Sequence, residues 1–141
     1  MRHFLLSALV LSMPFTLLAH GEDKPGPHGG FIRMPGGFHT EVSISKDKLS
    51  VYLLDINWKN PSTKDSTVKV DYVQNSKLSS LTCEASKTSF SCTLPKEFNS
   101  NEGTLVVKAK REGMTGAAAE YPLPLTLIKY GDDKDDHSKH H

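Results

Sequence analysis

The sequence lacks an excess of charge of either sign. Its 141 residues carry 17 Lys and Arg against 16 Asp and Glu, and no basic cluster stands out along the chain. Nucleic-acid binding depends on Lys and Arg that neutralise backbone phosphates, and docking on anionic lipid depends on similar clusters. The composition therefore argues against both classes of partner.

The sequence has one long apolar run, from Phe4 to Leu18, and no second one. Residues 1–19 read MRHFLLSALVLSMPFTLLA, in which a lone arginine precedes this run and the small residue Ala19 follows it. That order is typical of a secretory signal peptide and is short for a membrane span. An uncleaved anchor is the alternative, which the turn-rich polar segment after the run disfavours. We expect a periplasmic or secreted protein that is cleaved before His20 and is not inserted in the membrane.

Cysteine is scarce, with Cys83 and Cys92 as the only two. In an exported chain a disulfide is the default interpretation of such a pair. If Lys87 and Thr88 form a two-residue turn in LTCEASKTSFSCTL, counting outward places the two cysteines opposite each other, at about 4.5 Å between their Cα atoms. A copper-binding thiol pair is the competing interpretation, but the hairpin contains no other ligand. We therefore predict a Cys83–Cys92 disulfide.

Helical periodicity longer than a turn or two is absent, and GMTGAAAE is the only weak candidate for a helix. Short alternating runs, KLSSLTCEA among them, predict about seven strands. They indicate an all-β, immunoglobulin-like antiparallel β-sandwich, in which Trp58 and the Phe and Leu residues fill the core. In FHTEVSIS and KLSVYLL, a turn at Lys46 and Asp47 pairs apolar with apolar residues. The prolines of YPLPLTLIKY indicate an edge strand. The predicted divisions are a signal peptide (1–19), an irregular Gly/Pro-rich segment (20–37), the β-sandwich (38–130) and a disordered Asp/His-rich tail (131–141).

Histidine is absent from residues 40 to 136, so the body of the predicted sandwich contains none. Past the signal peptide the histidines lie at the two ends, at positions 20, 28, 39, 137, 140 and 141. The commonest shared role of clustered histidines is metal ligation. His39 and Glu41 leave one face of a strand about 7 Å apart, and the glycines after His28 permit a reversal toward that face. We predict a copper or zinc site with His28, His39 and Glu41 as core ligands.

Two further residues extend this predicted site. His20 would supply an imidazole and a free α-amine after cleavage, and the thioether of Met34 would favour copper. Tyr52, opposite Glu41 in the predicted hairpin, is a candidate hydrogen-bond donor beside the site. Each predicted ligand also has an ordinary interpretation. His39 and Glu41 fit a solvated surface pair, His28 fits an exposed loop residue, and Met34 fits a residue that caps the core. The tail histidines fit either a solvated tail or weak binding of ions without a defined site.

A resemblance supports the metal hypothesis. The stretch PHGGFIRMPGGFHTEVSI, followed by LSVYLLD, is similar to a domain found in exported bacterial proteins and in periplasmic adaptor subunits of heavy-metal efflux systems. Those domains carry His-Gly-Gly, then Gly-aromatic-His-x-Glu, then Tyr-x-x-Asp. The resemblance covers nearly all of residues 26 to 128 and implies a metal-related periplasmic role. The chain departs from the adaptors because it lacks their coiled-coil and membrane-fusion segments.

Three functions remain open from the sequence. The first is a periplasmic transition-metal binding protein, copper before zinc, serving as a metal chaperone or as an accessory to heavy-metal efflux, with an efflux component as its partner. The second is a non-metal structural or interaction module of the cell envelope. The third and weakest is an oxidative enzyme with a copper brace at His20. Hydrolysis is disfavoured because the chain has no Gly-x-Ser-x-Gly motif.

Overall fold

The computed structural model describes residues 20–128, and they form an all-β structure with no helix. The predicted signal peptide and tail lie outside these residues. The strands are β1 (His20–Gly21), β2 (Phe31–Met34), β3 (His39–Ser45), β4 (Lys48–Leu54), β5 (Thr67–Gln74), β6 (Lys77–Ser80), β7 (Thr82–Ala85), β8 (Phe90–Thr93), β9 (Thr104–Arg111), β10 (Met114–Thr115) and β11 (Ala119–Pro122). Since these residues contain no helix, they also contain none that could cross a membrane.

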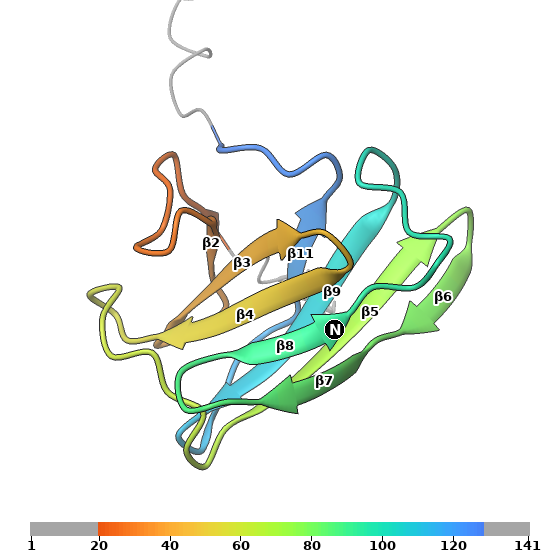
Figure 1. Cartoon of the computed structure of the whole chain (residues 1–141). Helices are drawn as coiled ribbons and strands as arrows, with labels where there is room; N and C mark the ends of the chain where they lie inside the picture. The colour runs from red at the N-terminus through yellow and green to blue at the C-terminus, as the bar shows by residue number, and fades with distance from the viewer. Residues whose placement is uncertain (1–19, 129–141) are drawn as a thin grey trace, which may run out of the picture.

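The strands form two antiparallel sheets that lie one behind the other (Figure 1). The six-stranded sheet has the order β1-β2-β3-β4-β8-β7. The five-stranded sheet has the order β10-β9-β5-β6, and β11 pairs with β9. The structure thus confirms the predicted all-β sandwich.

The core lies between the two sheets and is filled by one side of each strand. In β3 and β4 the inward residues include Val42, Val51 and Leu53, and in the second sheet they include Val70 and Leu105; all five are fully buried. The predicted β3–β4 register is confirmed, because Ile44 pairs with Leu49 and Val42 with Val51. Period-two alternation decides this register, since a slip by one residue would turn every apolar side chain to the outside.

Three local expectations differ from the structure. The segment 20–37 is not irregular throughout, because β1 and β2 lie within it and extend the six-stranded sheet. The run KLSSLTCEA is not one strand: β6 pairs with β5 and β7 with β8, so the chain passes from one sheet to the other at Leu81. The weak helix candidate contains instead β10, which pairs with the end of β9. In each case tertiary pairing overrides the local pattern.

The proline-rich strand lies at an edge, as predicted. β11 pairs with β9 alone, and its strand pairing ends at Pro122, well before the end of the run YPLPLTLIKY. Pro122 is exposed and Pro124 lies beyond the strand. A proline has no N–H to donate to a ladder, which accounts for the early end of the strand.

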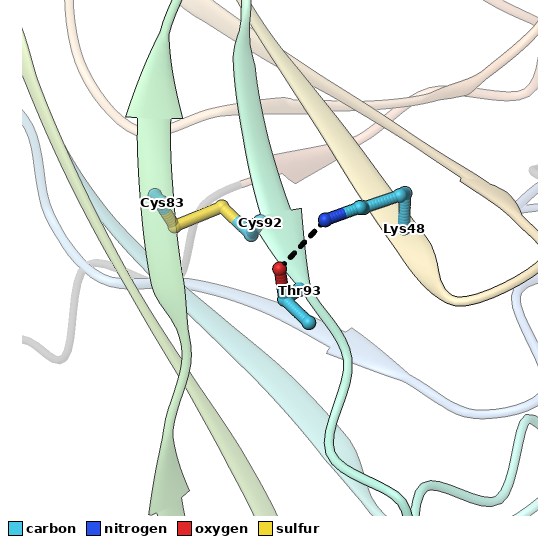
Figure 2. The surroundings of a disulfide bond; sticks show 4 residues. All are labelled: Lys48, Cys83, Cys92 and Thr93. Atoms are coloured by element: carbon cyan, nitrogen blue, oxygen red, sulfur yellow. Dashed lines mark hydrogen bonds between the residues drawn. A yellow bond between two sulfur atoms is a disulfide. The ribbon is translucent and has the colours of Figure 1, made fainter.

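A disulfide joins the edge strand β7 to β8, and Figure 2 shows its surroundings. Cys83 pairs with Cys92 in the antiparallel register, and their Cα atoms are 4.0 Å apart. The hairpin turns as predicted, because the backbone N–H of Ser86 donates to the carbonyl oxygen of Ser89. Beside the disulfide, Lys48 donates to the Thr93 hydroxyl across β4 and β8 (Figure 2). The disulfide therefore holds the outermost strand of the sheet in register.

We expect the double substitution Cys83→Ala/Cys92→Ala to lower the free energy of unfolding by about 2–3 kcal/mol, the value for a short closed loop. Urea denaturation measured by circular dichroism checks this. The double substitution Ser86→Ala/Ser89→Ala in the same hairpin is the matched control and should cost about 1 kcal/mol or less. Equal losses in the two variants would contradict the assigned role of the disulfide.

Candidate metal site on the outer face of the six-stranded sheet

The outer face of the six-stranded sheet has a small buried cluster of its own. Ile32, Glu41 and Leu54 are fully buried, yet none of them belongs to the core between the sheets. Alternation along each strand explains this, because Ile32 pairs with Glu41 and their inward neighbours point to the other sheet. The Gly/Pro-rich segment that precedes β2 covers this outer face, with Gly26 and Gly30 directly against Glu41.

The Glu41 carboxylate organises this covering segment. Its Oε2 accepts hydrogen bonds from the backbone N–H groups of His28 and Gly30, both at 2.9 Å, and its Oε1 lies 2.7 Å from Nδ1 of His28. The side chain of Glu41 is fully buried, whereas a third of the His28 side chain is exposed. A buried carboxylate is tolerated only when donors surround it, and here two amides and an imidazole do so.

The glycines of PGPHGG are required by this close approach. A Cβ atom built on Gly26 would lie 2.4 Å from Oε2 of Glu41, and one on Gly30 would lie 2.5 Å from the carbonyl oxygen of Val42. Gly29 has a φ of +73°, in the left-handed region that suits glycine. The backbone N–H of Gly29 donates to the carbonyl oxygen of Gly26, which closes the turn. The sequence therefore brings N–H donors against a buried acid by omitting side chains.

The His28 ring is held from two sides. It stacks on Tyr52, with ring centroids 3.7 Å apart and an interplanar angle of 4°. Tyr52 pairs with Glu41 across β3 and β4, as predicted. Since the carboxylate accepts at Nδ1, the hydrogen-bond network assigns the proton to that nitrogen. In the neutral ring, Nε2 of His28 then carries the lone pair.

His39 is held by the loop that follows β4. Only 4% of its surface is exposed, and its Nδ1 lies 3.1 Å from the carbonyl oxygen of Asp55. A carbonyl can only accept, so Nδ1 carries the proton and Nε2 the lone pair. Nε2 of His39 has no hydrogen-bond partner among residues 20–128. Every buried side-chain nitrogen or oxygen of these residues does have one. Nε2 therefore reaches solvent.

Trp58 contacts the His39 ring, with centroids 5.9 Å apart and an interplanar angle of 71°. The expectation that Trp58 fills the sandwich core is wrong, because it lies outside the buried cluster between the sheets. Its φ of 62° is unusual for a bulky residue. Such a backbone angle persists where the surrounding structure imposes it, and the loop 55–60 supplies that constraint.

The Asp55 side chain fixes this loop. Its carboxylate accepts hydrogen bonds from the backbone N–H groups of Asn57 and Lys59, both at 2.9 Å, and from the side chain of Asn60 at 2.7 Å. The bond from Lys59 is the main cause that lowers the pKa of Asp55 below its ordinary value of 3.8. On the other side of the loop, Arg111 from β9 donates to the carbonyl oxygens of Leu53 and Asn60.

The structure brings the predicted site residues together in two groups rather than one. His28 and Glu41 are in direct contact. Position 20 pairs with Met34 across β1 and β2. Arg33 pairs with Thr40, so Met34 and His39 face each other at the end of the β2–β3 hairpin. Among residues 20–128, no three His, Cys, Asp or Glu side chains are gathered as a metal site, so the predicted three-ligand set of His28, His39 and Glu41 is not assembled.

Sequence reasoning missed the part played by the loop 55–60. The signal for it was present in DINWKN, because Asp and Asn bond the backbone two residues on and thereby favour turns. No signal in the sequence shows that the loop turns back toward β3.

Comparison of the chain with protein-family models, with curated proteins and with solved structures finds no match.

We expect Glu41→Gln to destabilise the protein by about 2–4 kcal/mol, because an amide presents an N–H group where the carboxylate accepts and leaves buried donors unpaired. Thermal and urea unfolding measure this loss. Glu84→Gln removes the same charge from an exposed position on β7 and should change the stability by less than about 0.5 kcal/mol. Similar effects of the two substitutions would show that Glu41 is not the organising residue.

Acid should release the loop 55–60. The folded-state pKa of Asp55 lies below 3.8, so the unfolded loop binds the proton first as the pH falls. Its stabilisation is complete above about pH 4 and is lost as the pH falls through the lower folded-state value. Trp58, the only tryptophan, reports this in its fluorescence. Asp55→Asn should abolish the transition in this range, whereas a transition retained in that variant would assign it to another group.

Proposed function

We propose that this protein is an exported binding protein for a transition metal ion, copper before zinc, and that it serves as a metal chaperone or as an accessory to heavy-metal efflux. One observation carries the proposal. The imidazoles of His28 and His39 both donate Nδ1–H to a fixed oxygen, and among the described residues neither Nε2 has a hydrogen-bond partner. Protein metal sites use this arrangement, because the second hydrogen bond fixes the tautomer and orients the ring.

Glu41 supports the site in this proposal rather than ligating the ion. Its two oxygens already accept three hydrogen bonds, and the residue is fully buried. Binding an ion at Glu41 would require these donors to give way, and buried donors without a partner cost about 1–3 kcal/mol each. A carboxylate that accepts from Nδ1 makes the imidazole of His28 a better donor at Nε2. Glu41 therefore acts on the ion through His28.

The preference for copper rests on the row formed by positions 20, 34 and 39 on three adjacent strands. Met34 brings a soft thioether to the same side of the sheet as His39, and thioethers select Cu(I) over harder ions. If the chain is cleaved after Ala19, the new α-amine lies in the same row. The row therefore combines two kinds of donor, imidazole nitrogen and thioether sulfur, that suit copper.

The resemblance to periplasmic domains of heavy-metal efflux systems agrees with this function. His28, Gly29 and Gly30 belong to the shared His-Gly-Gly turn, and Glu41 to the shared strand. These residues act together, because the His-Gly-Gly turn donates its backbone N–H groups to the Glu41 carboxylate. An efflux component is accordingly the partner that we propose.

Metal titration followed by calorimetry and by Trp58 fluorescence tests the proposal. The protein should carry His137, His140 and His141 as glutamine, so that the tail contributes no imidazole. Trp58 contacts the His39 ring, so a change in its emission reports binding there. Met34→Leu should weaken Cu(I) binding about tenfold or more and leave Zn(II) binding nearly unchanged. Affinity should fall in acid, because protons compete with the metal ion for the imidazole nitrogens.

Met114→Leu is the matched control, because Met114 is an exposed methionine outside the row. His28→Gln and His39→Gln then separate the two imidazoles, since only the second should remove the fluorescence response. Equal affinities for Cu(I) in the Met34 and Met114 variants would contradict the proposed site. Absence of any metal-dependent rise in melting temperature would contradict the proposed function and favour an interaction module.

A further inference from the structure

A groove of about 450 Å³ lies on the five-stranded sheet, which is opposite to the sheet that carries the candidate metal site. Residues of β5, β9 and the segment that begins at β10 line it. Three of the lining residues are lysines, Lys69, Lys108 and Lys110, and two are threonines, Thr67 and Thr115. No acidic residue lines the groove.

Strand pairing places these groups side by side. Lys69 lies directly opposite Lys108 across β5 and β9. Lys110 lies opposite Thr67 on β5 and opposite Thr115 on β10. All three lysines are exposed and alternate with inward residues of the core, so they share the outer face of the sheet. Like charges directly opposite each other destabilise a sheet unless a counter-charge is present.

The protein does not supply that counter-charge among the residues that the structure describes. No ion pair there involves any of the three lysines. Two acidic residues lie nearest on the same face. Asp71 follows Lys69 by two residues in β5, and Glu120 lies on β11, which pairs with β9. Asp71 is buried and accepts a hydrogen bond from the Ser80 hydroxyl on its other side. Glu120 is exposed and forms no ion pair with any of the three lysines, so their ammonium groups are available to a ligand.

We propose that this groove binds a small molecule that carries phosphate groups. Three ammonium groups balance an anion of two or three charges, and the threonine hydroxyls add donors. Lysine binds phosphate as a point charge from several directions, whereas planar recognition of a carboxylate is the work of arginine, which is absent from the lining. The volume of the groove is in the range of small-ligand sites. Sequence composition conceals this site, because β5 and β9 lie far apart along the chain.

Sodium pyrophosphate is the probe, titrated into the full chain by calorimetry at constant ionic strength with chloride as the reference anion. Lys108→Gln should weaken pyrophosphate binding about tenfold, as expected for the loss of one charge-assisted contact. Lys87→Gln removes the same charge at the tip of the β7–β8 hairpin and should change the affinity less than twofold. Without ligand, the melting temperature of the Lys108→Gln variant should equal or exceed that of the parent, because one member of an opposed like-charge pair is gone.

Two outcomes would overturn the proposal. The first is pyrophosphate binding no tighter than chloride, or equally weakened in both lysine variants. The second is binding to vesicles that contain phosphatidylglycerol, but not to pyrophosphate, with loss of that binding in the Lys108→Gln variant. The second result would assign the lysines to a membrane surface instead of a small ligand. Backbone amide shifts confined to residues 67–69, 108–110 and 115–118 on adding pyrophosphate would support the groove itself.

Discussion

The buried carboxylate of Glu41 is the constraint on which the outer face of the six-stranded sheet depends. Burying an acid in an apolar setting is unfavourable unless donors surround it, and the covering segment provides two amides and an imidazole. The same three bonds fix the segment, since a glycine- and proline-rich chain has little side-chain packing to hold it. Without the Glu41 carboxylate the covering segment loses the acceptor that fixes it, and without the segment the buried carboxylate loses its donors. The acid and its covering are therefore one structural unit.

This unit also decides what chemistry the face can perform. An imidazole with free rotation presents either nitrogen, whereas His28 is stacked on Tyr52 and bonded at Nδ1, so it presents only Nε2. His39 reaches the same state by a different route, through the backbone of Asp55 and the indole of Trp58. Two separate sets of contacts, one from strand residues and one from the loop 55–60, thus impose the same tautomer on two rings. Preorganisation of this kind lowers the entropic cost of binding, because the donors are already oriented.

The fold was predictable from sequence where the determining contacts are local. The β3–β4 and β7–β8 hairpins have short turns, so alternation and counting outward from the turn fix their registers, including the cysteine pair. The strand β2 was missed, because FIRM is four residues long between glycine and proline, and only pairing with β3 makes it a strand. The passage between sheets at Leu81 was missed although the sequence carries a signal for it, because the apolar positions shift by one residue between Leu78 and Leu81.

The candidate site also has features that the sequence could predict and features that it could not. The meeting of His28 with Glu41 could be anticipated, since glycines permit the reversal and a strand fixes the acid. The occupation of Glu41 by backbone N–H groups could not, because backbone donors leave no mark in the sequence. The position of Trp58 depends on a left-handed backbone angle that its residue type disfavours.

The two faces of the sandwich also differ in how their charges are satisfied, and this bears on how the protein can work. On the six-stranded sheet, the covering segment satisfies the Glu41 carboxylate with hydrogen bonds, and the lone pairs left over are those of nitrogen and sulfur, which suit a soft cation. On the five-stranded sheet, three ammonium groups have no ion-pair partner among the described residues, which suits an anion. The core between the sheets separates the two regions, so filling one places no ligand against the other. Under the two proposals, a protein with near-zero net charge attracts ions of opposite sign at separate places, because its two sheets carry different groups on their outer faces.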